Sequence, residues 1–278
     1  MLTVILAAIL ALPPQKSDAI IGVTAIHLES GKRLSVRNAE RFPMGSVYKF
    51  PIALTVLKRV DAGTLSLKQS VTIDPKDFGP GWSPLRDKAN HRPITLTVGE
   101  LVRHMASNSD NTASDALLAL VGGPQVVTTR MAELGFSAIG VHRSETQMAA
   151  DLKADGGPER YAVDARDTTT PDAMADLLVA FFHKRDGLTS ASHDLLMKHL
   201  IDSPTGVHRI KAAVPAGATV AHKTGTMPGT TNDVALVTLP NGDHVALAIF
   251  TKASRRDKAE DTEEDIRAIT RKVLAELR

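Results

Sequence analysis

The sequence predicts an α/β protein of the mixed, α+β kind, with one sheet built from both ends of the chain. Segments with strand-like patterns lie near both termini, and helical patterns fill the middle. No low-complexity linker separates these parts. For the chain to form one compact body, the terminal strands must share a sheet and the helical block must be inserted into it.

Five segments are predicted to be strands of this sheet. The first two are joined by a turn at Glu29-Ser30-Gly31, and the last two by Asn241-Gly242, a strong hairpin signal. Such connections predict an antiparallel sheet. The five strands are expected at residues 20–26, 32–36, 219–223, 234–239 and 244–250.

The helices of the middle are predicted from their start and stop signals. Pro51 lies in the first turn of an apolar stretch that Gly63 ends. Thr97-Val98-Gly99-Glu100 fits a capping box, and Thr170-Pro171 is typical of a helix start. The chain closes with an amphipathic helix. The helices are expected at residues 50–60, 101–106, 112–120, 170–184 and 266–277.

These elements predict two interlocked domains. We expect a discontinuous α/β domain from residues 1–41 and 206–278, and an all-helical domain from residues 42–205. The functional site should lie at the seam between them, where pockets commonly form.

Composition excludes several classes of function. Apolar residues make up 43% of the 278 residues, too many for a disordered chain. The net charge of +2 argues against nucleic acid or an anionic membrane as the main partner. The chain has no cysteine, and its ten histidines show no zinc-hydrolase spacing. We therefore expect no metal and no cofactor.

The N-terminal segment 2–12 is apolar and is followed by Pro13-Pro14. It fits the hydrophobic part of a secretory signal, which predicts a periplasmic or secreted protein, although the usual preceding basic residues are missing. The alternative is a helix packed on the body of the fold. The segment is too short to span a bilayer, so no stable membrane anchor is expected.

Residue types suited to catalysis occur together in three short strings, the first of which is Ser46-Val47-Tyr48-Lys49. Ser46 precedes a long apolar helix, where its hydroxyl faces the positive end of the helix dipole and its N–H is unpaired. Lys49 follows one turn later, on the same side, and can relay the serine proton. The alternative is a helix-capping serine with a solvated lysine.

The other two strings are Ser109-Asp110-Asn111 and Lys223-Thr224-Gly225. The second is expected in a polar break between helices, where a hydroxyl can pass a proton and an amide can bind a carbonyl; an ordinary turn is the alternative. The third offers a cation, a hydroxyl and a glycine on a strand, where a ligand can approach closely. Its alternative is an exposed edge strand protected by a lysine.

In this order, the three strings resemble those of class A serine β-lactamases and penicillin-binding proteins. The resemblance covers almost the whole chain, since segments such as 42–45, 50–54 and 166–171 also look like class A. It implies a β-lactamase/transpeptidase-like fold, a five-stranded antiparallel sheet with an all-helical domain. Glu145-Thr146-Gln147-Met148 looks like the extended-spectrum branch, whose omega loop is a variant.

The resemblance also implies roles. Ser46 would attack the β-lactam carbonyl, and the N–H groups of Ser46 and Thr226 would form the oxyanion hole. Lys49 and Glu145 would share the proton transfers, and Ser109 would protonate the leaving nitrogen. The substrate-binding residues implied are Asn111 for the side-chain amide, Lys223, Thr224, Gly225, Thr226 and Arg209 around the carboxylate, and Trp82. Trp82 falls near the aromatic wall of the family, with core or surface packing as its alternative.

Glu145 distinguishes between the classes of protein that share these three strings. A β-lactamase must aim a base at a water to hydrolyse the acyl-enzyme, whereas a D-Ala-D-Ala peptidase or a β-lactam receptor need not. Arg143-Ser144-Glu145 fits the family pattern, but Ala149 replaces the usual Asn. Glu159 is a weaker rival for the role of base, and the alternative for Glu145 is a glutamate on a surface loop.

We expect an Arg143–Asp167 ion pair at the base of this loop; a wide separation of the two side chains would mark the variant loop. The expected substrates are β-lactam antibiotics, and the expected state is a monomer.

Overall fold

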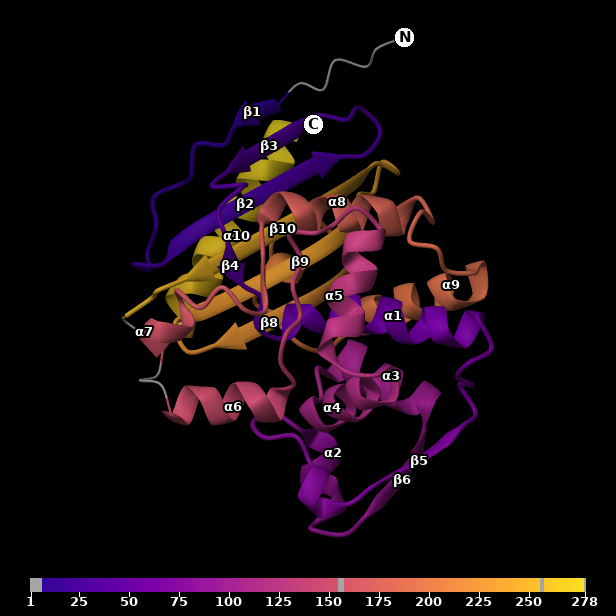
Figure 1. Cartoon of the computed structure of the whole chain (residues 1–278). Coiled ribbons are helices and arrows are strands. Elements are labelled where there is room, and N and C mark those ends of the chain that lie inside the picture. The colour runs from indigo at the N-terminus through magenta and orange to yellow at the C-terminus, as the bar shows by residue number, and fades with distance from the viewer. Residues whose placement is uncertain (1–6, 155–157, 256–257, 278) are drawn as a thin grey trace.

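The structure, a computed structural model, describes residues 7–154, 158–255 and 258–277 (Figure 1). Its main sheet has six strands in the order β1-β3-β2-β10-β9-β8, antiparallel except for the β1–β3 pair. The five expected strands are all present, and the mixed α/β class is confirmed. The strands are β1 (Ala7–Ile9), β2 (Ile20–His27), β3 (Arg33–Val36), β8 (Thr219–Met227), β9 (Thr230–Thr238) and β10 (His244–Lys252).

The sixth strand, β1, corrects the expected strand count. The helix proposed for residues 2–12 is not formed by the described part, because residues 7–9 pair in parallel with β3. Residues 1–6 lie outside the described residues. Leu10 follows β1 and is buried against the sheet. The extended conformation of residues 7–9 is therefore set by burial and by pairing at the edge of the sheet. A local sequence pattern cannot predict such an effect.

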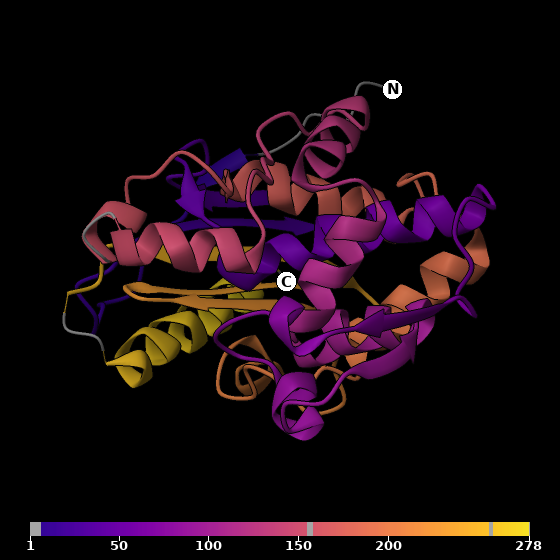
Figure 2. The ribbon, with the colours of Figure 1, turned by 60° about the horizontal axis from the view of Figure 1, so that its bottom comes forward.

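Helices cover both faces of the sheet: in Figure 2 the yellow helix α10 lies against one face, and α8 packs on the other. The expected starts are confirmed, because Thr97 and Glu100 form a capping box and Thr170 caps α8. The helices are α1 (Lys49–Asp61), α2 (Pro84–Ala89), α3 (Val98–Asn108), α4 (Asn111–Leu120), α5 (Pro124–Glu133), α6 (Glu145–Ala154), α7 (Pro158–Tyr161), α8 (Pro171–Phe182), α9 (Ser190–Ile201) and α10 (Ala259–Leu277).

The inserted segment 42–205 is not wholly helical, which corrects the sequence-based expectation. β4 (Phe42–Pro43) pairs with β7 (Thr168–Thr169), and β5 (Ser70–Ile73) pairs with β6 (Ile94–Thr97). The β-branched residues of β5 and β6 favour this extended pairing. The domain boundaries at 41/42 and 205/206 remain a prediction.

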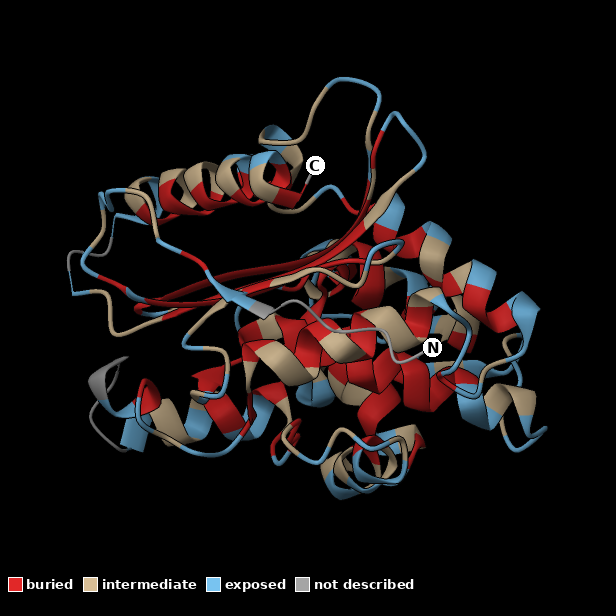
Figure 3. Cartoon of the chain, turned by 90° about the horizontal axis from the view of Figure 1, so that it is seen from above, coloured by how far each residue is buried: buried red, intermediate tan, exposed pale blue. Residues whose placement is uncertain are grey.

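The central strands are buried on both faces (Figure 3). In β10, Ala246, Ala248 and Phe250 belong to the apolar cluster of the helical side, while Val245, Leu247 and Ile249 belong to the cluster under α10. This alternation follows the two-residue period of a strand. Within the described residues, no helix is both long and apolar enough to cross a membrane.

Candidate active site

Ser46 lies in a single 3-10 turn, η1 (Gly45–Tyr48), directly before α1. Asn232 of β9 fixes the chain entering this turn, because its amide donates to the carbonyl oxygens of Pro43 (2.8 Å) and Met44 (3.0 Å). Gly45 adopts φ +49°, a left-handed conformation that favours glycine. The turn that carries the serine is therefore held rigidly against the sheet.

Lys49 is completely buried and lies at the centre of the site. Its Nζ is 3.0 Å from Ser46 Oγ, 2.8 Å from the Ser109 carbonyl oxygen and 2.5 Å from Asn111 Oδ1. An ion pair of 2.9 Å joins it to Glu145 Oε1. The alternative of a solvated lysine is wrong, since one ammonium group links the serine with a carboxylate.

The second string lies in the break between α3 and α4, as expected. Asp110 caps α4 by accepting from the N–H of Ala113 at 2.9 Å, while Ser109 takes a left-handed conformation, φ +58°. Such a backbone is rare for serine and is retained where the surroundings enforce it. It directs Ser109 Oγ to Lys223 Nζ, 2.9 Å away.

The third string lies on the edge strand β8, and Lys223 is buried rather than exposed. Burial, followed by the nearby Lys49 charge, holds the pKa of Lys223 well below its ordinary value. Gly225 allows β8 to approach the serine turn, because a Cβ built there would lie 2.3 Å from the Met44 carbonyl oxygen. The alternative of a protective lysine on an exposed edge is therefore wrong.

Arg209 and Trp82 flank these elements. Arg209 is buried, donates from Nη2 to Thr226 Oγ1 at 2.8 Å and pairs with Glu263 at 3.0 Å. Arg209 therefore fixes the position of the Thr226 side chain through this hydrogen bond. Trp82 is 63% exposed, and its ring N–H donates to the Asn108 carbonyl oxygen at 2.9 Å, which excludes core packing for this residue.

Glu145 begins α6 and reaches Lys49, so the surface-glutamate alternative is wrong; its side chain is buried. Asp115 of α4 caps α6 from outside, accepting from the N–H groups of Glu145 (2.7 Å) and Thr146 (3.0 Å). Ala149 lies one turn later on α6 and offers no amide. The side chain of the rival Glu159, and the turn at residues 155–157, lie outside the described part.

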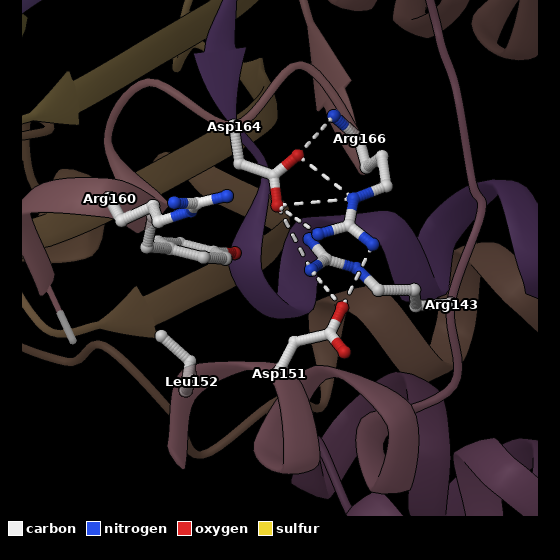
Figure 4. Close-up of a pocket in the computed structure, with 7 residues that line it drawn as sticks. Arg143, Asp151, Leu152, Arg160, Asp164 and Arg166 are labelled. Atoms are coloured by element: carbon white, nitrogen blue, oxygen red, sulfur yellow. Dashed lines mark hydrogen bonds and ion pairs between the residues drawn. The ribbon is translucent and has the colours of Figure 1, made fainter. Parts of the chain in front are cut away.

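The loop that carries Glu145 is closed by ion pairs around Arg143 (Figure 4). Arg143 Nε is 2.6 Å from Asp167 Oδ2, which confirms the expected pair. Its Nη1 contacts Asp151 (2.9 Å) and Asp164 (3.0 Å), and Arg166 also pairs with Asp164 (2.7 Å). The wide Arg143–Asp167 separation that would mark the variant loop is not present.

The structure brings together Ser46, Lys49, Ser109, Asn111, Glu145 and Lys223 through direct contacts. Sequence reasoning missed Asp115, although it lies one helical turn after Asn111 on the same face of α4 and could have been found by that spacing. It also missed Asp151 and Asp164, whose role depends on the folded loop and has no local signal.

A model of the β-lactamase enzyme family matches residues 2–277. The chain is 35% identical over 246 residues to β-lactamase VEB-1 and 33% identical over 243 residues to extended-spectrum β-lactamase PER-1, both of Pseudomonas aeruginosa. These alignments cover 86% and 85% of the chain, and 79% and 76% of the relatives. The ancestral (GNCA) class A β-lactamase superposes with a TM-score of 0.84 at 32% identity, covering 94% of this chain and 95% of that one.

Proposed function

The chain belongs to the class A β-lactamases, a family of serine enzymes, and from this premise we propose that it hydrolyses β-lactam antibiotics through an acyl-enzyme on Ser46. One observation carries the proposal: Lys49 Nζ lies 3.0 Å from Ser46 Oγ and 2.9 Å from Glu145 Oε1. The serine hydroxyl and the Glu145 carboxylate thus both lie within 3.0 Å of one amine, through which a proton can be relayed.

In acylation, Ser46 Oγ attacks the lactam carbonyl carbon and its proton passes to the Lys49–Glu145 pair. The N–H groups of Ser46 and Thr226 stabilise the oxyanion. As the C–N bond breaks, Ser109 Oγ gives its proton to the ring nitrogen. The proton that the Lys49–Glu145 pair took from Ser46 then replaces the one lost by Ser109, so Glu145 is again free to accept a proton and Lys223, 2.9 Å from Ser109 Oγ, keeps its own.

The substrate is held at two ends. Lys223, Thr224 and Thr226 bind its carboxylate beside Gly225, with Arg209 holding Thr226 in place. Asn111 presents an oriented amide, because its Oδ1 accepts from Lys49 and its Nδ2 donates to the Pro80 carbonyl oxygen at 2.6 Å. The exposed Trp82 ring offers an apolar wall at the rim.

In deacylation, Glu145 takes a proton from a water that attacks the ester carbonyl, and this proton passes to Ser46 Oγ as the ester bond breaks. Ala149 gives this water no amide, so Glu145 and backbone groups hold it. The Asp115 cap supports this role, since it fixes the first N–H groups of α6 and with them the Glu145 backbone.

Replacing Glu145 tests the assignment. Glu145→Gln should still acylate but lose at least about a hundredfold in deacylation, the scale of a lost general base, so a stable acyl-enzyme should be seen by intact-protein mass spectrometry. Glu159→Gln is the matched control, at the rival position of the same loop, and should turn over normally. Rapid turnover by Glu145→Gln, or trapping only in Glu159→Gln, would assign the base elsewhere.

Two other functions would use the same serine: a D-Ala-D-Ala peptidase and a β-lactam receptor that does not hydrolyse. A chromogenic cephalosporin separates them from a β-lactamase. Steady turnover indicates the β-lactamase, and one stoichiometric burst followed by silence indicates a peptidase or a receptor. The buried Lys49–Glu145 pair favours turnover. We further propose a periplasmic or secreted monomer.

A further inference from the structure

Three hydroxyl groups form a continuous chain of contacts from the end of α3 to the edge strand β8. Ser203 Oγ donates to the Ser107 carbonyl oxygen at 2.9 Å, and it lies 3.0 Å from Thr205 Oγ1. Thr205 Oγ1 in turn lies 2.8 Å from Thr224 Oγ1. Ser203 and Thr224 are buried and Thr205 is half-buried, so the chain of hydroxyls is largely shielded from water.

The Ser107 carbonyl group fixes the direction of the hydrogen bonds in this chain. It lies in the last turn of α3, where carbonyl oxygens have no partner within the helix, and a carbonyl oxygen can only accept. Ser203 therefore uses its one hydroxyl proton on Ser107. The proton between Ser203 and Thr205 must then come from Thr205, and the proton between Thr205 and Thr224 must come from Thr224.

The opposite direction would leave one of these contacts without a proton. If Thr205 turned its proton toward Thr224, the Ser203 and Thr205 oxygens would face each other at 3.0 Å with no proton between them. The loss of such a hydrogen bond is costly in a buried position. Ser203 Oγ is already oriented as an acceptor toward Thr205, because the Thr205 N–H donates to it at 3.4 Å.

The direction of the chain engages the Thr224 proton with Thr205, so this proton is not available to a substrate carboxylate. A carboxylate only accepts hydrogen bonds, and Thr224 can donate to it only after turning its proton away from Thr205. Thr205 must then turn its own proton from Ser203 to Thr224. Each proton stays on its own oxygen, and the Ser203–Thr205 hydrogen bond is exchanged for one from Thr224 to the carboxylate.

We propose that Ser203 and Thr205 are positioning residues that hold the Thr224 proton in the free protein and thereby lower its affinity for substrates with a carboxylate. This inference rests on the proposed function, in which Thr224 binds that carboxylate. The effect is confined to substrate binding, because the hydrogen bond that joins Ser46 to Lys49 does not involve these hydroxyls.

Ser203→Ala tests the proposal. It removes the acceptor of the Thr205 proton, which can then turn to Thr224 without the loss of a hydrogen bond. KM for a penicillin should therefore fall about threefold to tenfold, the effect of one hydrogen bond between neutral groups, with kcat unchanged. The methyl ester of this penicillin lacks the carboxylate and should show the same KM in both proteins. A purely structural role of Ser203 would raise KM for both substrates or change neither, and either result would overturn the proposal.

Ser107→Ala is the matched control. It also removes a buried hydroxyl, which donates to the His199 carbonyl oxygen at 2.7 Å, but it keeps the carbonyl group at which the chain of hydroxyls ends. Its KM for the penicillin should equal that of the parent protein, and a fall as large as in Ser203→Ala would contradict the proposal.

Thr205→Val decides the question if Ser203→Ala does not fold. Valine has nearly the shape of threonine and removes the acceptor of the Thr224 proton directly, so the same fall in KM for the penicillin is expected. An unchanged or higher KM would contradict the proposal. Failure of the proposed function is distinguishable, since the parent protein would then turn over neither substrate.

Discussion

At the scale of single residues, Gly225 decides how closely the edge strand and the serine turn approach. A Cβ there would lie 2.3 Å from the Met44 carbonyl oxygen and 3.2 Å from the Ser46 nitrogen. Both contacts are backbone, so no flexible side chain can move aside. The glycine therefore sets the position of an N–H assigned to the oxyanion hole.

We expect Gly225→Ala to lower kcat/KM at least about tenfold and the free energy of unfolding by about 1–3 kcal/mol, the usual cost of overpacking. Stopped-flow acylation and thermal melts would measure the two effects. Gly99→Ala in α3 is the control, because its nearest contact would be 3.3 Å and alanine favours a helix. Normal acylation by Gly225→Ala would show that the turn and β8 can separate without loss.

The reactive residues of the site could be predicted from the sequence, and the residues that hold them could not. Ser46, Lys49 and Lys223 stand in short strings whose residue types carry the chemistry. Asn232 and Asp164 act through neighbours that are distant in the sequence, Met44 and Arg143, and a single polar residue has no pattern to mark it. Their identification needed the packing of β9 on the turn that carries Ser46 and the closed form of the loop that carries Glu145.

At the scale of elements, the loop from Arg143 to Asp167 holds Glu145 through buried and half-buried charges. The pKa of Asp164 is lowered to about 2, chiefly by its hydrogen bonds from the Arg166 guanidinium. A carboxyl whose pKa is lower in the folded state stabilises the protein above its ordinary pKa. That contribution is lost as the pH falls toward 2.

We therefore expect the loop to open in acid before the rest of the protein unfolds. Between pH 4 and pH 2 the Asp164 contribution, on the order of 1 kcal/mol after allowance for solvent screening, should disappear. Hydrogen exchange of α6, followed by mass spectrometry, would report this opening. In Asp164→Asn the loop should exchange faster at neutral pH and respond less to acid; an unchanged acid response would place the titrating group elsewhere.

The N-terminal segment shows where local patterns fail at this scale. Residues 2–12 are apolar except for Thr3, a pattern that a signal, a helix and a buried strand can share. The structure makes residues 7–9 a strand because β3 presents an unpaired edge and the cluster under α10 takes up Leu10. The helices with capping signals, such as α3 and α8, were predicted correctly because their signals are local.

At the scale of the whole molecule, the sheet separates two apolar clusters, and the site lies on one side only. A chain that begins at Pro13 would lose β1 and Leu10, which is 1% exposed on the α10 side. We expect a fall of about 2–4 kcal/mol in the free energy of unfolding, as for removal of a buried leucine, with kcat unchanged at 25 °C. Denaturant titration and steady-state assays would measure both, and an undiminished stability would show that β1 contributes nothing.

The pairing of β2 with β10 has a consequence for synthesis. His27 of β2 lies opposite Val245 of β10. β2 therefore cannot pair with β10 until nearly the whole chain has been synthesised. The serine, the lysine and the glutamate leave the ribosome well before the strands that complete the sheet. Contacts of such sequence separation slow folding, and a nascent or truncated chain without β10 has no assembled pocket. We therefore expect no activity until the last strand has been made, so that activity would report complete folding.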